Sequence, residues 1–276
     1  MSFLSRASGF LWGGPLLAAF LIVGGYYSVR TGFFQLFRFP LWWRTSAGSL
    51  LRRRKGRGSG VTQLQALSTA LAATIGTGSI AGVAAAIFCG GPGAVFWMWV
   101  SAFLGMMTGC AEKTLAVRHR ERGPDGLWRG GPMAYMERGL HLRGLARVYA
   151  VLCVCETLCG GNLAQANSIA TSLHALTGAD RLAVGVVLAA ATAVILVGGI
   201  RRVGQLSELL VPLMALLFIG GGAVVLVVRA QALPQALADI VRYAFAPRAA
   251  AGGYAMGTAL RYGVARGVFT NEAGLG

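Results

Sequence analysis

A glycine-rich run interrupts one of the most apolar stretches of the chain. The stretch extends over residues 61–90, and residues 76–82 in its middle read GTGSIAG. Glycine in a helix interior costs about 1 kcal/mol, and unpaired backbone in hydrocarbon costs several more. Freed amide N–H groups can hold a carboxylate, and freed carbonyls can coordinate a desolvated cation. The run therefore predicts a broken helix that lines a cavity suited to an amino acid and Na⁺.

A second interrupted segment of the same kind occupies residues 263–276, which read GVARGVFTNEAGLG. Two glycine-interrupted apolar segments in corresponding positions of two repeats are a pointer to a transporter binding site. Taken alone, Gly78 and Gly82 also fit a GxxxG packing motif between membrane helices. A dinucleotide fingerprint is disfavoured, because the run lacks the flanking strand and the following acidic residue.

The composition identifies the elements that must position these runs. The chain has 55% hydrophobic and only 12% charged residues, with a mean hydropathy of +0.63. These values predict an all-α integral membrane protein, because a spanning helix needs about 20 apolar residues. Seven segments are expected to span the bilayer: 10–30, 61–89, 93–117, 146–176, 183–200, 209–228 and 254–276.

The basic residues predict the orientation of these segments. The loops after the first, third and fifth segments hold eighteen Lys and Arg, against five on the opposite side. Cytoplasmic loops carry the excess of Lys and Arg, so the amino terminus is predicted to face outside. Arg261 and Arg266 lie within the seventh segment, where an ionisable residue is a functional candidate.

Other site chemistries find little support. The five cysteines fall inside apolar segments without zinc or disulfide spacing, so no metal site is expected. His119, His141 and His174 are scattered, and no nucleophile, base and acid set appears, so no catalytic residue is expected. The aromatic and arginine-rich stretch 33–44 suits the inner headgroup layer, and its juxtamembrane position disfavours stacking on a nucleic acid. The net charge of +16 is expected to report membrane topology and no nucleic-acid partner, because the chain is mostly apolar.

Several ordered blocks resemble the alanine or glycine:cation symporters, also called sodium:alanine symporters. Residues 76–83 read GTGSIAGV, similar to that family's GTGNIAGV, and residues 90–99 match its GGPGAVFWMW. Residues 266–276 read RGVFTNEAGLG, similar to its RGxFSNEAGLG. Shorter agreements lie between them, including Gln165 and the block NSIA at 167–170.

The resemblance implies the inverted-repeat fold of the bacterial leucine transporter, with one extra N-terminal helix. Residues 1–60 would form that helix and a basic interfacial segment, 61–228 the first five-helix repeat, and 229–276 an outer loop and the start of the second repeat. The second repeat would be mostly missing, since the sequence stops within the second broken helix. The resemblance also implies a multi-pass protein of the cell inner membrane.

The resemblance further implies the site residues. Thr77, Gly78 and Ser79 would line the substrate site, facing Gln165 and Asn271. By analogy with the wider fold, backbone carbonyls of Ala72, Ile75 and Gly76 are expected to bind the cation. No catalytic residue and no cofactor are implied, Na⁺ being the coupling ion.

Three departures and three open assignments accompany the resemblance. Ser79 replaces the family's Asn, which trades an amide for a short hydroxyl and puts substrate choice in doubt. Gly109 and His119 replace an expected Lys and Tyr, and are expected to affect the inner loop. Gln165 could instead hydrogen-bond a neighbouring helix, and the roles of Glu156 and Glu272 stay open.

Two functions are therefore kept. The first is sodium-coupled uptake of a small neutral amino acid, alanine or glycine, by alternating access across the lipid bilayer. The second is a non-transporting truncated membrane fragment, or an assembly partner of a second chain. The sequence ranks neither the amino acids nor their stereoisomers, and it does not separate Na⁺ from H⁺.

Overall fold

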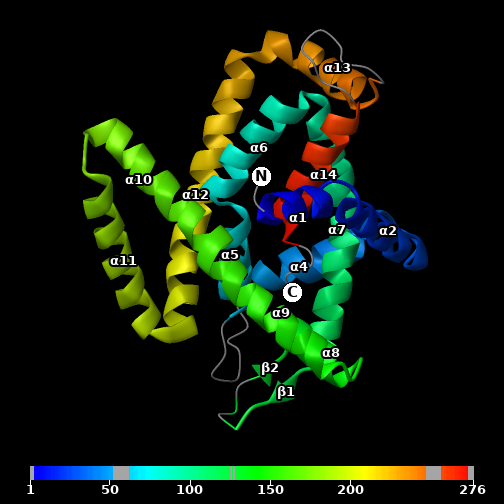
Figure 1. Cartoon of the computed structure of the whole chain (residues 1–276), viewed down its shortest axis with the longest axis vertical. Coiled ribbons are helices and arrows are strands. Elements are labelled where there is room, and N and C mark those ends of the chain that lie inside the picture. Colours follow the sequence, from blue (N-terminus) through cyan, green and yellow to red (C-terminus); the bar gives the residue numbers. More distant parts are fainter. Residues whose placement is uncertain (1–2, 52–61, 125, 127, 247–255, 273–276) are drawn as a thin grey trace. The chain divides into compact units, whose positions relative to one another are not determined.

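The structure is a computed structural model that describes residues 3–51, 62–124, 126, 128–246 and 256–272 (Figure 1). It is mainly helical, as predicted. The first helices are α1 (Phe3–Leu11), α2 (Pro15–Arg30), α3 (Phe34–Phe37), α4 (Phe39–Leu51), α5 (Gln63–Thr74), α6 (Thr77–Gly90) and α7 (Gly93–Arg118). The later ones are α8 (Pro132–Arg138), α9 (Arg143–Glu156), the π-helix η1 (Thr157–Leu163), α10 (Ala164–Thr177), α11 (Arg181–Val197), α12 (Gly199–Val228), the 3₁₀ turn η2 (Ala230–Ala232), α13 (Leu233–Ala244) and α14 (Met256–Asn271).

A small hairpin departs from the all-α prediction. Strands β1 (Glu121–Arg122) and β2 (Trp128–Arg129) pair antiparallel, with Glu121 opposite Arg129 and Arg122 opposite Trp128. Two residues per strand carry no hydrophobic alternation, so the sequence pattern gave no strand signal.

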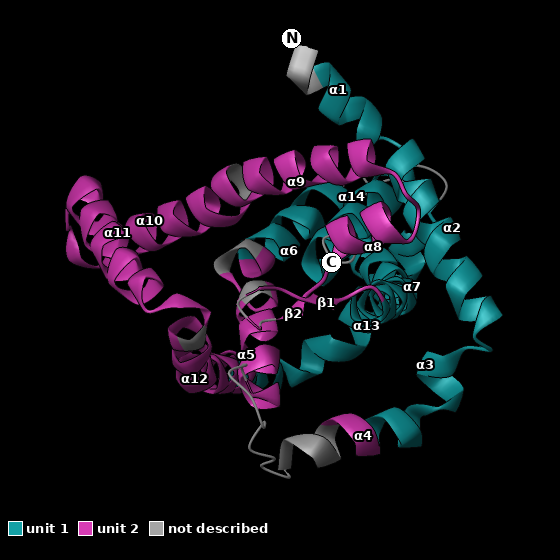
Figure 2. Ribbon diagram, turned by 90° about the horizontal axis from the view of Figure 1, so that it is seen from below, with its two compact units in different colours: residues 1–43, 81–118, 222–276 teal, residues 44–80, 119–221 magenta. Residues whose placement is uncertain are grey.

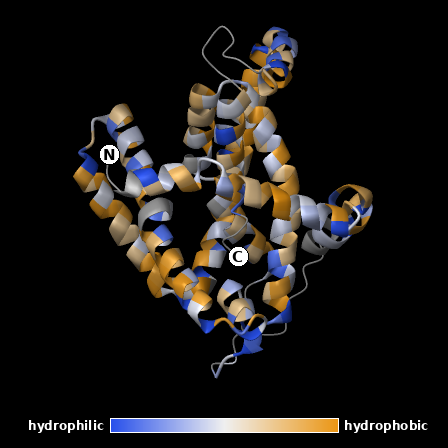
Figure 3. Ribbon diagram, turned by 45° about the vertical axis from the view of Figure 1, so that its right-hand side comes forward, coloured by the Kyte–Doolittle hydropathy of each residue, from blue (hydrophilic) through white to orange (hydrophobic). Residues whose placement is uncertain are grey.

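The predicted spans are largely confirmed. In the described part of the chain, four helical stretches are long and apolar enough to cross a membrane: Arg6–Arg30, Gly93–Arg118, Arg143–Thr177 and Arg202–Val228. Two shorter apolar helices, Ser79–Gly90 and Arg181–Val197, overlap two further predicted segments. Figure 3 shows that hydrophobic residues predominate along many of these helices. The chain is therefore a multi-pass membrane protein.

The seventh predicted segment corresponds to α14, and the structure places its interruption later than expected. The helix is continuous from Met256 to Asn271, so Arg266 and Gly267 lie inside it. Glu272 follows with a left-handed φ of 50°, which a helix cannot continue through. Residues 273–276 of the second glycine-rich run lie outside the described residues.

Two compact units divide the chain (Figure 2). One comprises residues 1–43, 81–118 and 222–276, and the other comprises residues 44–80 and 119–221. In the first unit, α2, α13 and α14 pack against α7. In the second unit, α8 packs against α9, and α10 packs against α11.

Small residues allow α14 to approach α7 closely. A Cβ on Gly267 would lie 2.7 Å from Cβ of Ser101, and a Cβ on Gly263 would lie 2.7 Å from Cβ of Trp97. Val264, between these glycines, is fully buried, and its carbonyl accepts a hydrogen bond of 3.5 Å from the Ser101 hydroxyl. Close backbone approach is how membrane helices associate when hydrophobicity offers no preference for protein over lipid.

The amphipathic helix α13 is fixed to the first turns of α7. The Trp97 indole Nε1 donates a hydrogen bond of 3.1 Å to the Ala244 carbonyl. The Phe245 ring packs edge-on against both Phe96 and Trp97, with centroids 5.0 and 5.9 Å apart. A Cβ on Gly93 would collide with the backbone of Tyr243. These contacts fix the C-terminal end of α13 on α7.

Local signals set the ends of several helices. The Thr62 hydroxyl accepts from the Gln65 N–H, and the Gln65 side chain accepts from the Thr62 N–H, a capping box that starts α5. Gly178, at a φ of 70°, ends α10. The Asp180 carboxylate then accepts from the Ala183 N–H and starts α11.

Candidate functional site

The predicted helix break lies between α5 and α6, at Ile75 and Gly76. The Ile75 N–H donates to the Leu71 carbonyl over 2.8 Å, which closes the last turn of α5. Ile75 itself leaves the helical conformation, with φ −91° and ψ 60°. Gly76 is buried. A two-residue connection therefore replaces a continuous helix inside the apolar segment.

The glycine-rich run itself is helical, in contrast to the expectation that it forms the interruption. Residues 77–82 occupy the first turns of α6, and the break precedes them. The Gly76 carbonyl accepts hydrogen bonds from the N–H groups of Ser79, at 3.0 Å, and Ile80, at 3.3 Å. The run thus begins a new helix, whose first N–H groups form the positive end of a helix dipole.

The predicted substrate residues at the break share this helix start. Thr77 and Gly78 form the first turn of α6, and their side chains lie outside the described residues. Ser79 is half-buried in the same turn. Backbone N–H groups at a helix N-terminus suit a carboxylate, because they point along the dipole and have no intrahelical partner. The start of α6 can therefore hold the carboxylate of an amino acid.

The predicted cation ligands lie on the other side of the break. Ala72 and Ile75 belong to the last turn of α5 and its C-cap, where carbonyl oxygens have no partner in the next turn of the same helix. The Gly76 carbonyl differs, because it already accepts two backbone hydrogen bonds. Carbonyl oxygens are ligands for a hard cation such as Na⁺. The carbonyls of Ala72 and Ile75 suit this role better than the carbonyl of Gly76.

Gln165 lies in the same compact unit as the break. It is half-buried on α10, in the first turn after η1. Between the described side chains, no hydrogen bond joins Gln165 to the break. Its role in binding therefore stays a prediction.

The π-helix η1 is a feature that the sequence analysis missed. It interrupts the apolar span Arg143–Thr177, directly after Glu156, whose side chain is exposed. π-helical turns inside α-helices occur frequently at functional sites, because they free a carbonyl and rotate the following side chains. The pair Gly160-Gly161 inside an apolar segment is the signal that could have indicated it.

Asn271, the last predicted substrate residue, belongs to the other compact unit. Its Nδ2 donates to the Ser101 carbonyl over 3.4 Å. A Cβ on Gly105 would lie only 2.7 Å from the same nitrogen. Asn271 therefore lies at the end of α14, closely packed on α7.

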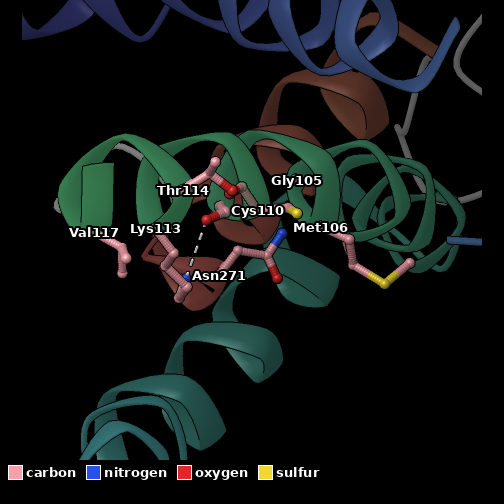
Figure 4. Close-up of a pocket in the computed structure, with 9 residues that line it drawn as sticks. Gly105, Met106, Cys110, Lys113, Thr114, Val117 and Asn271 are labelled. Atoms are coloured by element: carbon pink, nitrogen blue, oxygen red, sulfur yellow. Dashed lines mark hydrogen bonds between the residues drawn. The ribbon is translucent and has the colours of Figure 1, made fainter. Parts of the chain in front are cut away.

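Asn271 lines a cavity of about 690 Å³ along the second half of α7 (Figure 4). The other lining residues belong to α7: Ala102, Gly105, Met106, Gly109, Cys110, Lys113, Thr114 and Val117. The ammonium group of Lys113 lies over Gly109 and is 3.5 Å from its carbonyl. The four-residue spacing of Gly105 and Gly109 is the sequence signal for this groove, because it removes two side chains from one helix face.

Arg266, a functional candidate in the sequence, is half-buried on α14. Its guanidinium lies 4.7 Å from the centroid of the Phe269 ring, at cation–π distance. It also occupies the space next to Gly82 of α6, where a Cβ would collide with it. The side chain of Arg266, in the second glycine-interrupted segment, therefore contacts Gly82 of the first.

Comparisons with known proteins bear on the family of the chain. The profile of the "Sodium:alanine symporter family" matches residues 1–276. The chain is 41% identical to an uncharacterized transporter of Haemophilus influenzae and 40% identical to the sodium/alanine symporter AgcS of Methanococcus maripaludis, over all of this chain and 60% and 61% of theirs. It is 37% identical to GlnT of Bacillus subtilis, named a probable sodium/glutamine symporter, over 98% of this chain and 55% of that one.

These relatives bear names of transporters and not of enzymes. The chain spans about 60% of the length of the first two. Together with the helix break and the apolar spans, the match over its whole length identifies its family. The chain belongs to the sodium:alanine symporter family.

Proposed function

We propose that the protein contributes to sodium-coupled symport of a small neutral amino acid, alanine or glycine, into the cell. The observation that carries the proposal is the helix break at Ile75 and Gly76 inside an apolar segment. It presents carbonyl oxygens at the end of α5 and N–H groups at the start of α6, and these are the donors and acceptors that a zwitterionic amino acid and a cation need.

The roles follow from this chemistry. The carboxylate of the amino acid binds at the start of α6, to the N–H groups of Thr77 and Gly78 and to the hydroxyl of Ser79. Carbonyls of Ala72 and Ile75 bind Na⁺, and Gly76 connects them to the start of α6. Gln165 and Asn271 complete the substrate site from α10 and α14. A small, glycine-lined space would exclude a larger substrate side chain.

Transport requires the site to open to each side of the membrane in turn. In the proposed architecture, residues 61–228 form one repeat of a leucine-transporter-like fold, residues 1–60 precede it, and residues 229–276 begin an inverted second repeat. The protein lies in the cell inner membrane with its amino terminus outside. Because the cation and the carboxylate bind on opposite sides of one break, binding of each raises the affinity of the site for the other. With both bound, the helix bundle can change between its outward-open and inward-open orientations.

A binding experiment tests this coupling without transport. The purified protein in detergent is titrated with labelled alanine at a series of Na⁺ concentrations, with K⁺ maintaining ionic strength. Linkage requires that the factor by which Na⁺ raises alanine affinity equals the factor by which alanine raises Na⁺ affinity. Alanine binding that is the same in Na⁺ and K⁺ would overturn sodium coupling at this break.

Substrate choice has a second candidate, because the relative GlnT is named for glutamine. Ser79 stands where the family pattern has Asn, and a shorter side chain enlarges the site. Competition of labelled alanine by unlabelled glutamine and glycine distinguishes the two. Stronger competition by glutamine than by glycine would replace the small substrate with a larger one.

A further inference from the structure

The hairpin after α7 places two arginines over one tryptophan ring. The Arg120 guanidinium carbon lies 4.5 Å from the centroid of the Trp128 ring, and that of Arg122 lies 5.4 Å from it. Trp128 is nevertheless 56% exposed, and both arginines are exposed. Stacking on an indole engages the face of a guanidinium, and its in-plane N–H donors stay available to an anion. The hairpin therefore presents two fixed guanidinium groups around one aromatic ring.

An ion pair with α8 fixes the hairpin and offsets the negative charge of its Glu121. Arg138 of α8 forms an ion pair of 2.9 Å with Glu121 of β1. The same guanidinium donates a hydrogen bond of 2.7 Å to the His119 carbonyl. Because Glu121 is paired in this way, it repels an incoming anion less than an unpaired carboxylate would. Asp125, the other acid of the hairpin segment, lies outside the described residues.

The hairpin is confined to the membrane surface by its connections. One candidate span ends at Arg118, and the next begins at Arg143. Strand β1 begins at Glu121, so an extended chain allows at most about 11 Å between it and the end of the first span. Both spans leave the segment on the same side of the bilayer, which the density of arginines identifies as the side of the anionic leaflet.

We propose that Arg120, Arg122 and Trp128 form a binding site for the phosphate of an anionic lipid headgroup. The indole lies at the level of the headgroups, where tryptophan is enriched, and the two guanidiniums donate hydrogen bonds to the phosphate oxygens. The site binds anionic lipid in preference to a zwitterionic lipid, because a choline headgroup offsets the phosphate charge. It does not depend on the transport function, and it is tested separately from it.

Quenching of Trp128 fluorescence by brominated lipids tests the site. The protein is reconstituted in phosphatidylcholine nanodiscs that contain about 20% phosphatidylglycerol, a proportion chosen to lie below saturation of the site. Bromine is placed on the acyl chains of either the anionic or the zwitterionic lipid. Subtracting the signal of Trp128→Phe isolates the contribution of Trp128. We expect more quenching per brominated anionic lipid than per brominated zwitterionic lipid.

Variants then separate a site from general attraction by charge. Arg120→Gln with Arg122→Gln should lose the preference for anionic lipid, by roughly fivefold for each guanidinium removed. The matched control, Arg143→Gln with Arg147→Gln, removes the same charge from the start of the next span and should keep the preference. Equal loss in both pairs, equal quenching by both lipids, or no quenching of Trp128 in the unchanged protein would overturn the proposal. The comparison of quenching by the two brominated lipids needs no substitution at the arginines, so it tests the proposal even if the arginine variants fold poorly.

Discussion

The guanidinium of Arg266 fills the space that a side chain on Gly82 would need. A Cβ built on Gly82 would collide with Cζ and Nη1 of Arg266 and lie 2.6 Å from Nε. The Arg266 guanidinium carbon also lies 4.7 Å from the centroid of the Phe269 ring. Gly82 belongs to α6 and Arg266 to α14, so this contact joins the helices that contain the two glycine-rich runs. Glycine at position 82 thus has a reason beyond the spacing of a GxxxG motif.

Gly82→Ala should destabilise the protein modestly, because the new Cβ would take the space of the Arg266 guanidinium and displace it from the Phe269 ring. Loss of a cation–π contact of this kind costs about 0.5–1 kcal/mol. Thermal unfolding of the purified protein in detergent measures it. Gly25→Ala is the matched control, since a Cβ there meets nothing within 4 Å.

A double-mutant cycle identifies Arg266 as the cause. In an Arg266→Met background, which keeps an apolar stem and removes the guanidinium, Gly82→Ala should add little further loss. Additive losses would mean that Gly82 is required for another reason.

Gly105→Ala should weaken alanine binding through Asn271. The new Cβ would lie 2.7 Å from Nδ2 of Asn271 and displace the amide from the Ser101 carbonyl. If Asn271 contacts the substrate, we expect about a tenfold weaker affinity for labelled alanine, equal to roughly 1.4 kcal/mol.

Gly109→Ala provides the control from the same cavity, one turn further along α7. A Cβ at Gly109 meets the flexible end of Lys113 at 3.2 Å, so the ammonium can move away at little cost. The two substitutions therefore differ in the neighbour that they displace. Equal effects on alanine affinity would remove Asn271 from the substrate site.

Ser79→Asn should change the ranking of substrates. The substitution restores the amide of the family pattern, and its longer side chain leaves less space next to the start of α6. Competition of labelled alanine by glycine, serine and glutamine measures the ranking. An identical order before and after the substitution would mean that position 79 does not face the substrate.

Trp97→Phe should loosen α13. The phenyl ring keeps the aromatic contact with Phe245 but leaves the Ala244 carbonyl without the indole donor, which costs about 0.5–1.5 kcal/mol. Hydrogen exchange of the amides of α13 measures the change. Trp99→Phe is the control, because Trp99 is exposed on the same helix, and comparable acceleration in both variants would contradict a specific role for Trp97.

The sequence located the spans and the first helix break closely, because hydropathy and glycine content report directly on what a bilayer tolerates. The glycine pattern predicts the break within residues 76–82. In the structure the break precedes most of this run, because Ile75 is the residue that leaves the helix and the glycines at 78 and 82 are helical. A helix tolerates glycine where neighbouring backbone, or a side chain such as that of Arg266, occupies the space that a Cβ would take. Composition alone does not distinguish this use from a break.

Other features depend on contacts between distant residues, which no local pattern contains. The close packing of α14 on α7 depends on Gly263 and Gly267 meeting Trp97 and Ser101, more than 160 residues apart in sequence. The hairpin at Trp128 has only two residues in each strand, too few for periodicity. The roles of Gln165 and Asn271 rest on resemblance, and they stay predictions.

Uptake of labelled alanine into proteoliposomes containing the purified protein tests sodium-coupled symport most directly. An inward Na⁺ gradient is imposed in one sample and replaced by K⁺ in the other. Sodium-coupled symport predicts transient accumulation of alanine above its external concentration only with the Na⁺ gradient. Equal uptake in both samples, or no uptake with Na⁺, would contradict it.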